Sequence, residues 1–245
     1  MTPFLTFALV APIASFGAIA VGERRPSWDR PARSAILGLA GACLGVERED
    51  DAGQADLANH YGVAVLCHAP GRLLVDYHTA QAPPTRGKRR FATRAAELAA
   101  PDLATILSRR DYRTGAWHLA ALWAGVPTPR WALPDIAAAM RAPVFTPYLG
   151  RKGCPLGLPL APELTEAAGP GAALARRHQA GPEAAFRLAM AEAPGAVVIA
   201  RDAWDGDGAN ARRIEVRRDQ PLSRRLWQFG LRREVVEGLP MEPSA

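Results

Sequence analysis

Short apolar runs alternate along the chain with segments of helical periodicity. The apolar runs Phe4–Val10, Val63–His68 and Leu73–Tyr77 predict strands, and the apolar spacing in Pro31–Val46 predicts a helix between the first two. The turn residues of Ala69–Arg72 predict that the second and third strands form a hairpin. The order strand, helix, strand, strand is half of a split β-α-β unit, so we expect an α+β fold with a ferredoxin-like or RNA-recognition-type sheet.

The second half of the chain carries a weaker pattern. Ala116–Ala124 predicts a strong strand, and Pro134 opens a short helix that continues to Arg141. Beyond about residue 160 the segment Pro162–Ala180 is rich in Ala and Gly and predicts no clear element. We therefore expect one domain over residues 1–160, with residues 161–245 as a C-terminal extension that packs on it. That extension would form a small irregular β region, from the short strands Val197–Arg201, Ile214–Arg218 and Arg224–Val236 and a turn at Asp202–Ala211.

The helix expected at Pro31–Val46 has two unusual features. Ser34 is suited to be its N-cap and Gly45 its C-cap, but Gly38 and Gly41 lie inside it, where each costs roughly 0.5–1 kcal/mol relative to Ala. This spacing suggests that another backbone comes close. Guanidiniums at a helix N-terminus favour an anion site, whereas a packed helix with a solvated basic approach fits equally well. The arginines at this helix start are Arg24, Arg25, Arg30 and Arg33.

A basic segment at about residues 79–114 interrupts the strand pattern. It is poor in core residues, so we expect an insertion that projects from the sheet. Arginines flank Tyr112, and arginine and aromatic side chains together are typical of RNA contacts; a solvated loop is the alternative. The basic residues proposed to contact RNA here are Arg86, Lys88, Arg89 and Arg109.

The segment Pro143–Leu158 is dense in Pro and Gly and predicts a rigid loop. It carries Tyr148, Arg151 and Lys152, residue types that can contact a phosphate or a base. A purely structural crossover is the alternative.

The charge of the chain supports a polyanionic partner. The net charge is +6, the sequence pI is about 9.8, and of 30 basic residues only Lys88 and Lys152 are lysines. The three cysteines lie far apart with no zinc-ligand spacing, so we expect no metal or other cofactor and a reducing cytoplasm. The apolar N-terminus lacks a basic n-region, and Pro3 and Pro12 interrupt it, which favours a strand and turn over a signal peptide. No run is long enough to predict a membrane span.

Four pieces of the sequence, in order, resemble one known family. These are LVAPIASFG (9–17), RPARSAILGLAGACLGVERED (30–50), DYHT (76–79) and FTPYLGRKGCPL (145–156), with a weaker match in the tail LSRRLWQFGLRREVV. The chain resembles the CasD family, Cascade subunits of type I-E CRISPR complexes within the RAMP superfamily. The resemblance implies an RNA-recognition-type sheet with an inserted thumb, and a subunit that holds the 5′ handle of crRNA. It also implies contacts to the backbone subunit CasC and the large subunit CasA, and indirectly to target DNA.

The resemblance also suggests regions and roles for single residues. Arg24, Arg25, Arg33 and Ser34 would offer guanidiniums and free N–H groups at the helix start. Tyr77 and His78 would stand at the base of the thumb, and Tyr148, Arg151 and Lys152 would line the far wall. The thumb itself would carry Arg86, Lys88, Arg89 and Arg109.

Two alternatives remain open from the sequence. In type I-E systems the separate subunit CasE cuts precursor RNA, so the resemblance implies a binder without a catalytic site. Some relatives in other CRISPR subtypes cut RNA without a metal, and Tyr77, His78 and Lys88 offer the residue types for that reaction. A generic RNA-binding module outside CRISPR is the second alternative.

Overall fold

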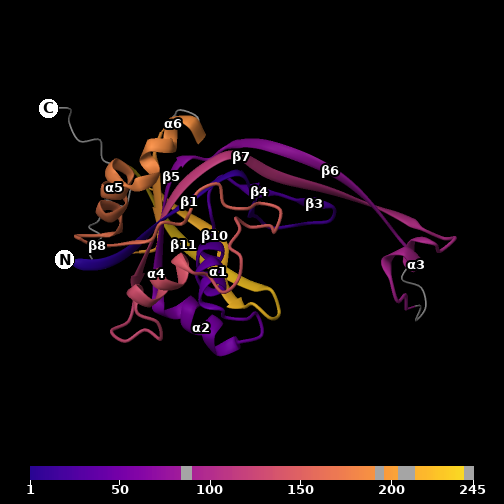
Figure 1. Ribbon diagram of the computed structural model, residues 1–245, viewed down its shortest axis with the longest axis horizontal. Coiled ribbons are helices and arrows are strands. Elements are labelled where there is room, and N and C mark those ends of the chain that lie inside the picture. The colour runs from indigo at the N-terminus through magenta and orange to yellow at the C-terminus, as the bar shows by residue number, and fades with distance from the viewer. Residues whose placement is uncertain (84–89, 191–195, 204–212, 240–245) are drawn as a thin grey trace.

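The computed structural model describes residues 1–83, 90–190, 196–203 and 213–239. These residues form a mixed α/β body around one large, mainly antiparallel sheet, with helices on both faces, and a long ribbon that projects from it (Figure 1). None of the helices in the described part of the chain is long and apolar enough to cross a membrane.

The sheet contains nine strands, and its main path runs β10-β11-β9-β5-β7-β1-β8, with β6 and β3 added along β7. Among the strands of the described residues, β3 alone pairs in parallel. A separate ladder joins β2 to β4. The strands are β1 (Thr2–Ala14), β2 (Phe16–Gly17), β3 (Arg24–Arg25), β4 (Ser27–Trp28), β5 (Tyr61–Ala69), β6 (Arg72–Ala82), β7 (Ala104–Ala124), β8 (Glu163–Ala167), β9 (Val198–Arg201), β10 (Arg213–Ser223) and β11 (Gln228–Gly238).

Six α-helices and one 3₁₀ helix are described. They are α1 (Arg33–Leu44), α2 (Asp51–His60), α3 (Arg94–Leu98), α4 (Leu133–Arg141), α5 (Pro170–Ala180), η1 (Pro182–Phe186) and α6 (Arg187–Met190). The helix predicted from Pro134 to Arg141 is confirmed as α4, with the proline in its first turn. The sequence did not predict β8 and α5, which form within the Ala- and Gly-rich segment.

The alternation of side chains along β1 explains why its apolar run is continuous. Leu5, Phe7 and Leu9 point into one core, which α1 and α4 cover. Phe4 and Ala8 point into a second core on the opposite face, which includes residues of α5. Because both faces of the strand are buried, hydrophobic residues fill nearly every position.

The predicted hairpin between the second and third strands is wrong. The strands β5 and β6 do not pair; both lie along β7, where Ala69 faces Trp117 and Arg72 faces Thr114. The chain therefore continues along β7 at this point instead of turning back. Gly71 permits the bend, because it has a φ of +75° and a Cβ there would lie 2.6 Å from the carbonyl oxygen of Thr114.

The long ribbon, here called the arm, consists of β6 and the first half of β7, residues 104–114, with α3 beyond their paired ends. Figure 1 shows the arm projecting far from the body. The basic segment after Pro101, which showed no strand pattern in the sequence, is thus a regular strand for most of its length. Arg86, Lys88 and Arg89 lie outside the described residues, as does most of the turn predicted at Asp202–Ala211.

The ends of α1 confirm one cap and correct the other. Gly45 is the C-cap with a φ of +76°, as predicted. The N-cap is Ala32, and Ser34 lies inside the first turn, so the prediction of a Ser34 cap is wrong. The carboxylate of Asp219 in β10 replaces the missing capping side chain by accepting a hydrogen bond from the backbone N–H of Arg33 at 2.9 Å.

Candidate nucleic-acid interface

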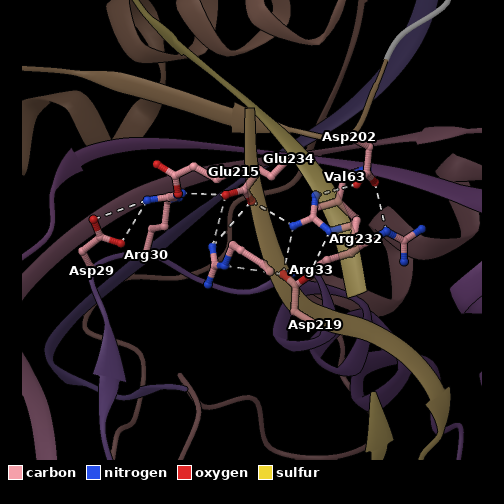
Figure 2. Close-up of polar contacts among 10 residues, drawn as sticks. Asp29, Arg30, Arg33, Val63, Asp202, Glu215, Asp219, Arg232 and Glu234 are labelled. Carbon is pink, nitrogen blue, oxygen red and sulfur yellow. Dashed lines mark hydrogen bonds and ion pairs between the residues drawn. The ribbon is translucent and has the colours of Figure 1, made fainter. Parts of the chain in front are cut away.

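A buried network of charged side chains fixes the start of α1 against the C-terminal strands (Figure 2). The guanidinium of Arg33 donates to the carboxylate of Asp202 at 3.0 Å and to the backbone oxygens of Ala58 and Tyr61 at 3.1 and 2.6 Å. Only 7% of its side chain is exposed. Arg33 is therefore a structural residue of the interior, and its guanidinium is not on the surface where the predicted RNA contact would need it.

Arg30 is the second arginine of this helix start that carboxylates hold in the interior. Its guanidinium lies 2.7 Å from Glu215 and 2.6 Å from Glu234. Burial lowers the pKa of Arg30, but the adjacent carboxylates outweigh it and raise the pKa above its ordinary value. Burial raises the pKa of Asp219, yet hydrogen bonds from Arg232 reverse this and leave that pKa below its ordinary value. Each charged side chain in this network is paired with an opposite charge inside the protein, so the role of the network is structural.

The half of the arm nearer the body, up to the middle pair Tyr77 and Arg109 and here called its base, gathers arginines that face solvent. The short strand β3 lies beside β7, where Arg24 is the register partner of Arg109. Arg24, Arg25 and Arg109 are exposed. The buried carboxylate of Asp111 accepts a hydrogen bond from Arg24 at 3.1 Å and so compensates one of these charges.

The loop Pro143–Leu158 adds a further arginine to the same place. The guanidinium of Arg151 donates to the backbone oxygens of Asp111 and Arg25, both at 3.1 Å, and stacks over the ring of Tyr112 at 4.5 Å. Tyr77 in β6 is the register partner of Arg109, and 63% of it is exposed. We call Arg24, Arg25, Tyr77, Arg109 and Arg151 the arm-base cluster; Arg24, Tyr77 and Arg109 lie on one face of the ribbon, whereas Arg25, the register partner of Arg110, and Arg151, stacked over Tyr112, lie on the other. Lys152, next to Arg151, is exposed.

His78 does not join Tyr77. The two residues are neighbours in β6, so their side chains point to opposite faces of the ribbon. The ring of His78 lies against the carboxylate of Asp76 on its own strand. Acid–base cleavage requires both groups to converge on one 2′-hydroxyl, and the arm does not bring these two together.

A cleft of about 1120 Å³ opens beside the arm-base cluster. One wall is the face of α1 that carries Ser34 and Gly38, a second is the loop with Phe145 and Tyr148, and the third is the end of the β10–β11 hairpin. The predicted residues Ser34 and Tyr148 thus lie in one cavity.

The two glycines inside α1 have different neighbours. A Cβ on Gly38 would lie 2.9 Å from the guanidinium of Arg224, on the cleft side. A Cβ on Gly41 would lie 2.9 Å from Leu57 of α2. Gly38 therefore makes room for an arginine of the C-terminal hairpin, and Gly41 for close helix packing.

Sequence reasoning missed the residues that the C-terminal hairpin brings to this cleft. Arg224, Trp227 and Phe229 come from a segment that the sequence predicted as a strand and as a weaker match to the family, without assigning any of its residues to RNA, and Arg48 comes from the exit of α1. The signal was the run RRLWQF, in which two arginines precede two aromatic residues, the residue types that single-strand binding proteins combine. Among the described residues no group of three or more His, Cys, Asp or Glu is placed to hold a metal ion.

Comparisons with known proteins agree on one family. A family model described as a CRISPR-associated protein (Cas_Cas5) matches residues 4–235. The chain is 32% identical over 168 residues to the CRISPR system Cascade subunit CasD of Escherichia coli (strain K12), which covers 65% of this chain and 70% of that protein.

Two solved structures share the fold. A chain of a CRISPR RNA-guided surveillance complex gives a TM-score of 0.63 at 24% identity, covering 96% of this chain and 90% of that one. A crystal structure of a Cas protein gives a TM-score of 0.58 at 22% identity, covering 97% and 95%.

Proposed function

Because the chain belongs to the Cas5 family of CRISPR-associated proteins, we propose that it is the crRNA-binding subunit of a type I-E Cascade surveillance complex. The observation that carries this proposal is the arm-base cluster, where β3 and β7 bring exposed arginines together and the loop adds the half-buried Arg151. A phosphate chain is the polyanion that such a cluster suits, since guanidiniums bind phosphate oxygens bidentately.

In this proposal the 5′ handle of crRNA crosses the base of the arm. Arg24, Arg25 and Arg109 contact phosphates, with Lys152 beside them, and the exposed ring of Tyr77 offers a stacking surface for a base. The handle then continues toward Tyr148 in the cleft. Arg86, Lys88 and Arg89 would extend the basic surface along the arm.

We infer that the body is a ferredoxin-like unit and that the arm is the inserted thumb. The order β1-α1-β5-β7-α4-β8, with β5, β7, β1 and β8 adjacent in the sheet, supports this. Because β9, β10 and β11 extend the same sheet, residues 161–245 are assigned to the same domain as residues 1–160. The projecting arm is suited to contact CasC, with CasA nearby and target DNA reached through the complex. The expected location is the cytoplasm.

We propose a binding role without catalysis. The opposite orientations of Tyr77 and His78 support it, because neither assists the other at a reacting group.

The test is co-purification of the tagged full-length protein after expression with the other Cascade subunits and a precursor repeat RNA. We expect crRNA to travel with the protein, and the double variant R25Q/R109Q to weaken RNA binding and lower the salt slope by about two. The control R130Q/R176Q removes two exposed arginines outside the arm-base cluster and should change binding far less.

Two outcomes would overturn the proposal. One is a protein that carries neither crRNA nor any Cascade subunit. The other is site-specific cleavage of the precursor RNA by the purified chain that is lost in H78A.

A further inference from the structure

The end of the β10–β11 hairpin presents a tryptophan in an unusual backbone conformation. Trp227 has a φ of +57°, in the left-handed region that bulky residues rarely adopt. The turn holds it there, because its backbone N–H donates to the oxygen of Arg224 at 3.3 Å. Even so, 61% of the residue is exposed at the edge of the cleft. A strained residue that gains so little burial is typical of a functional site.

Arg48 and Phe229 pack against the ring of Trp227. The guanidinium of Arg48 lies 5.0 Å from the ring centre, and its Nε donates to the backbone oxygen of Arg224 at 2.9 Å. Phe229 packs edge-on against the ring at 5.5 Å. Since Arg48 covers part of the indole and fixes the turn, the remaining ring surface is a firm platform with a cation beside it.

Arg224 is the second cation of the cleft. Its guanidinium donates to the backbone oxygen of Ser34, and in the described part of the chain it has no carboxylate partner. Burial and the charge of Arg48 both lower the pKa of Arg224, so an anion placed near these two guanidiniums would relieve an unfavourable environment. Glu47 and Glu49 line the same cleft, which leaves the Arg224 side as the place for a phosphate.

We propose that this cleft is a subsite for one unpaired nucleotide, whose base stacks on Trp227 and whose phosphate lies against Arg224. The inference rests on the proposed crRNA-binding function and adds a second contact site to the arm-base cluster. Tyr148 and Gly150 line the cleft, and Arg151 follows them directly, so the cleft adjoins the side of the arm-base cluster that holds Arg25 and Arg151. The volume of about 1120 Å³ is ample for a nucleotide.

The experiment measures binding of the full-length protein to single-stranded RNA of the repeat sequence. We expect W227A to weaken binding about tenfold, the effect of losing one base stack, and W227F to retain most of it. W227G should also lose binding while keeping or improving thermal stability, because glycine accepts a positive φ. R224Q should weaken binding and reduce its salt dependence. The control F186A removes another exposed aromatic ring, on η1 and outside the cleft, and should bind normally.

Three results separate this inference from the proposed function. If W227A and R224Q bind RNA normally while R25Q/R109Q does not, the subsite is wrong and the proposed function stands. If W227A binds RNA normally but no longer assembles with the other Cascade subunits, the cleft is a protein-docking surface and the inference is overturned. If the wild-type protein binds no RNA, the proposed function fails as well.

Discussion

The guanidinium of Arg33 joins three segments that are far apart in the chain. It contacts Ala58 and Tyr61 at the junction of α2 and β5, and Asp202 just after β9, while its backbone N–H is capped by Asp219 of β10. A buried arginine that uses its donors on carbonyls and a carboxylate holds these segments in a fixed arrangement.

We predict that R33A lowers the free energy of unfolding by about 3 kcal/mol. The substitution removes the hydrogen bonds to two buried carbonyls and takes one partner from Asp202. Chemical denaturation of the purified full-length protein measures the change. R176A, which removes an exposed arginine, is the control and should change stability by less than about 0.5 kcal/mol. A loss in R33A no larger than in R176A would contradict the structural role.

At the residue scale the sequence indicated chemistry better than location. It identified Arg24, Arg25 and Arg33 as one basic group at a helix start, but the first two face solvent and the third is buried. The difference depends on Asp202 and Asp219, about 170 and 186 residues further along the chain. Local patterns do not reveal a partner at that separation.

The loop Pro143–Leu158 shows how one element is fixed by another. The backbone N–H of Ser15, just after β1, donates to the oxygen of Leu149 at 3.0 Å. Gly150 then has a φ of +89°, and a Cβ there would lie 1.6 Å from the backbone oxygen of Ser15. Since that atom belongs to the backbone, no side-chain movement relieves the clash. This contact positions Tyr148, which lines the cleft, and Arg151, which belongs to the arm-base cluster.

We predict that G150A lowers the free energy of unfolding by at least about 2 kcal/mol and weakens RNA binding as well. The loop must move away from Ser15, which displaces Arg151. Thermal denaturation and RNA titration of the full-length protein measure the two effects. G153A lies in the same loop with nothing within 4 Å of its Cβ and should be close to neutral. Equal behaviour of both variants would show that the loop is not held in this way.

Elements with a strong apolar pattern were predictable, and those defined by distant pairing were not. The strand β1, the helices α1 and α4, and the strand β9 all follow from their own sequences. The break at Gly71 gave a turn signal, but the same residues continue a strand when a long partner such as β7 lies alongside. The short, largely exposed β8 is an edge strand of the sheet, so its sequence carries no apolar run.

At the scale of the whole molecule, the two faces of the sheet carry different chemistry. On the face covered by α1 lie the interior charge network and the cleft. The face covered by α5 buries a pair of histidines. His68 of β5 and His178 of α5 lie 3.1 Å apart between ring nitrogens, and both rings pack edge-on against Trp117. His118 of β7 is fully buried beside Phe16. This arrangement requires that all three imidazoles be neutral in the folded protein.

The histidines therefore predict how stability depends on pH. Burial lowers the pKa of His68 and of His178 to about 4, and that of His118 to about 3, whereas an unfolded histidine has a pKa of about 6.5. Between pH 6.5 and 4 the unfolded chain binds protons that the folded chain does not. The free energy of unfolding has its full value above pH 6.5. Below that pH it should fall by up to about 1.4 kcal/mol per pH unit for each histidine.

Denaturation of the full-length protein at fixed pH values between 4 and 7 measures this slope. The variant H118L removes one of the three groups without adding a polar atom, so its slope should be shallower than that of the wild-type protein by the share of a single histidine. If stability is constant across this range, or the H118L slope equals that of the wild-type protein, the folded protein accommodates charged imidazoles. The α5 face around His68 and His178, or the α1 face around His118, would then have to open on protonation, since no carboxylate hydrogen-bonds to these rings among the described residues.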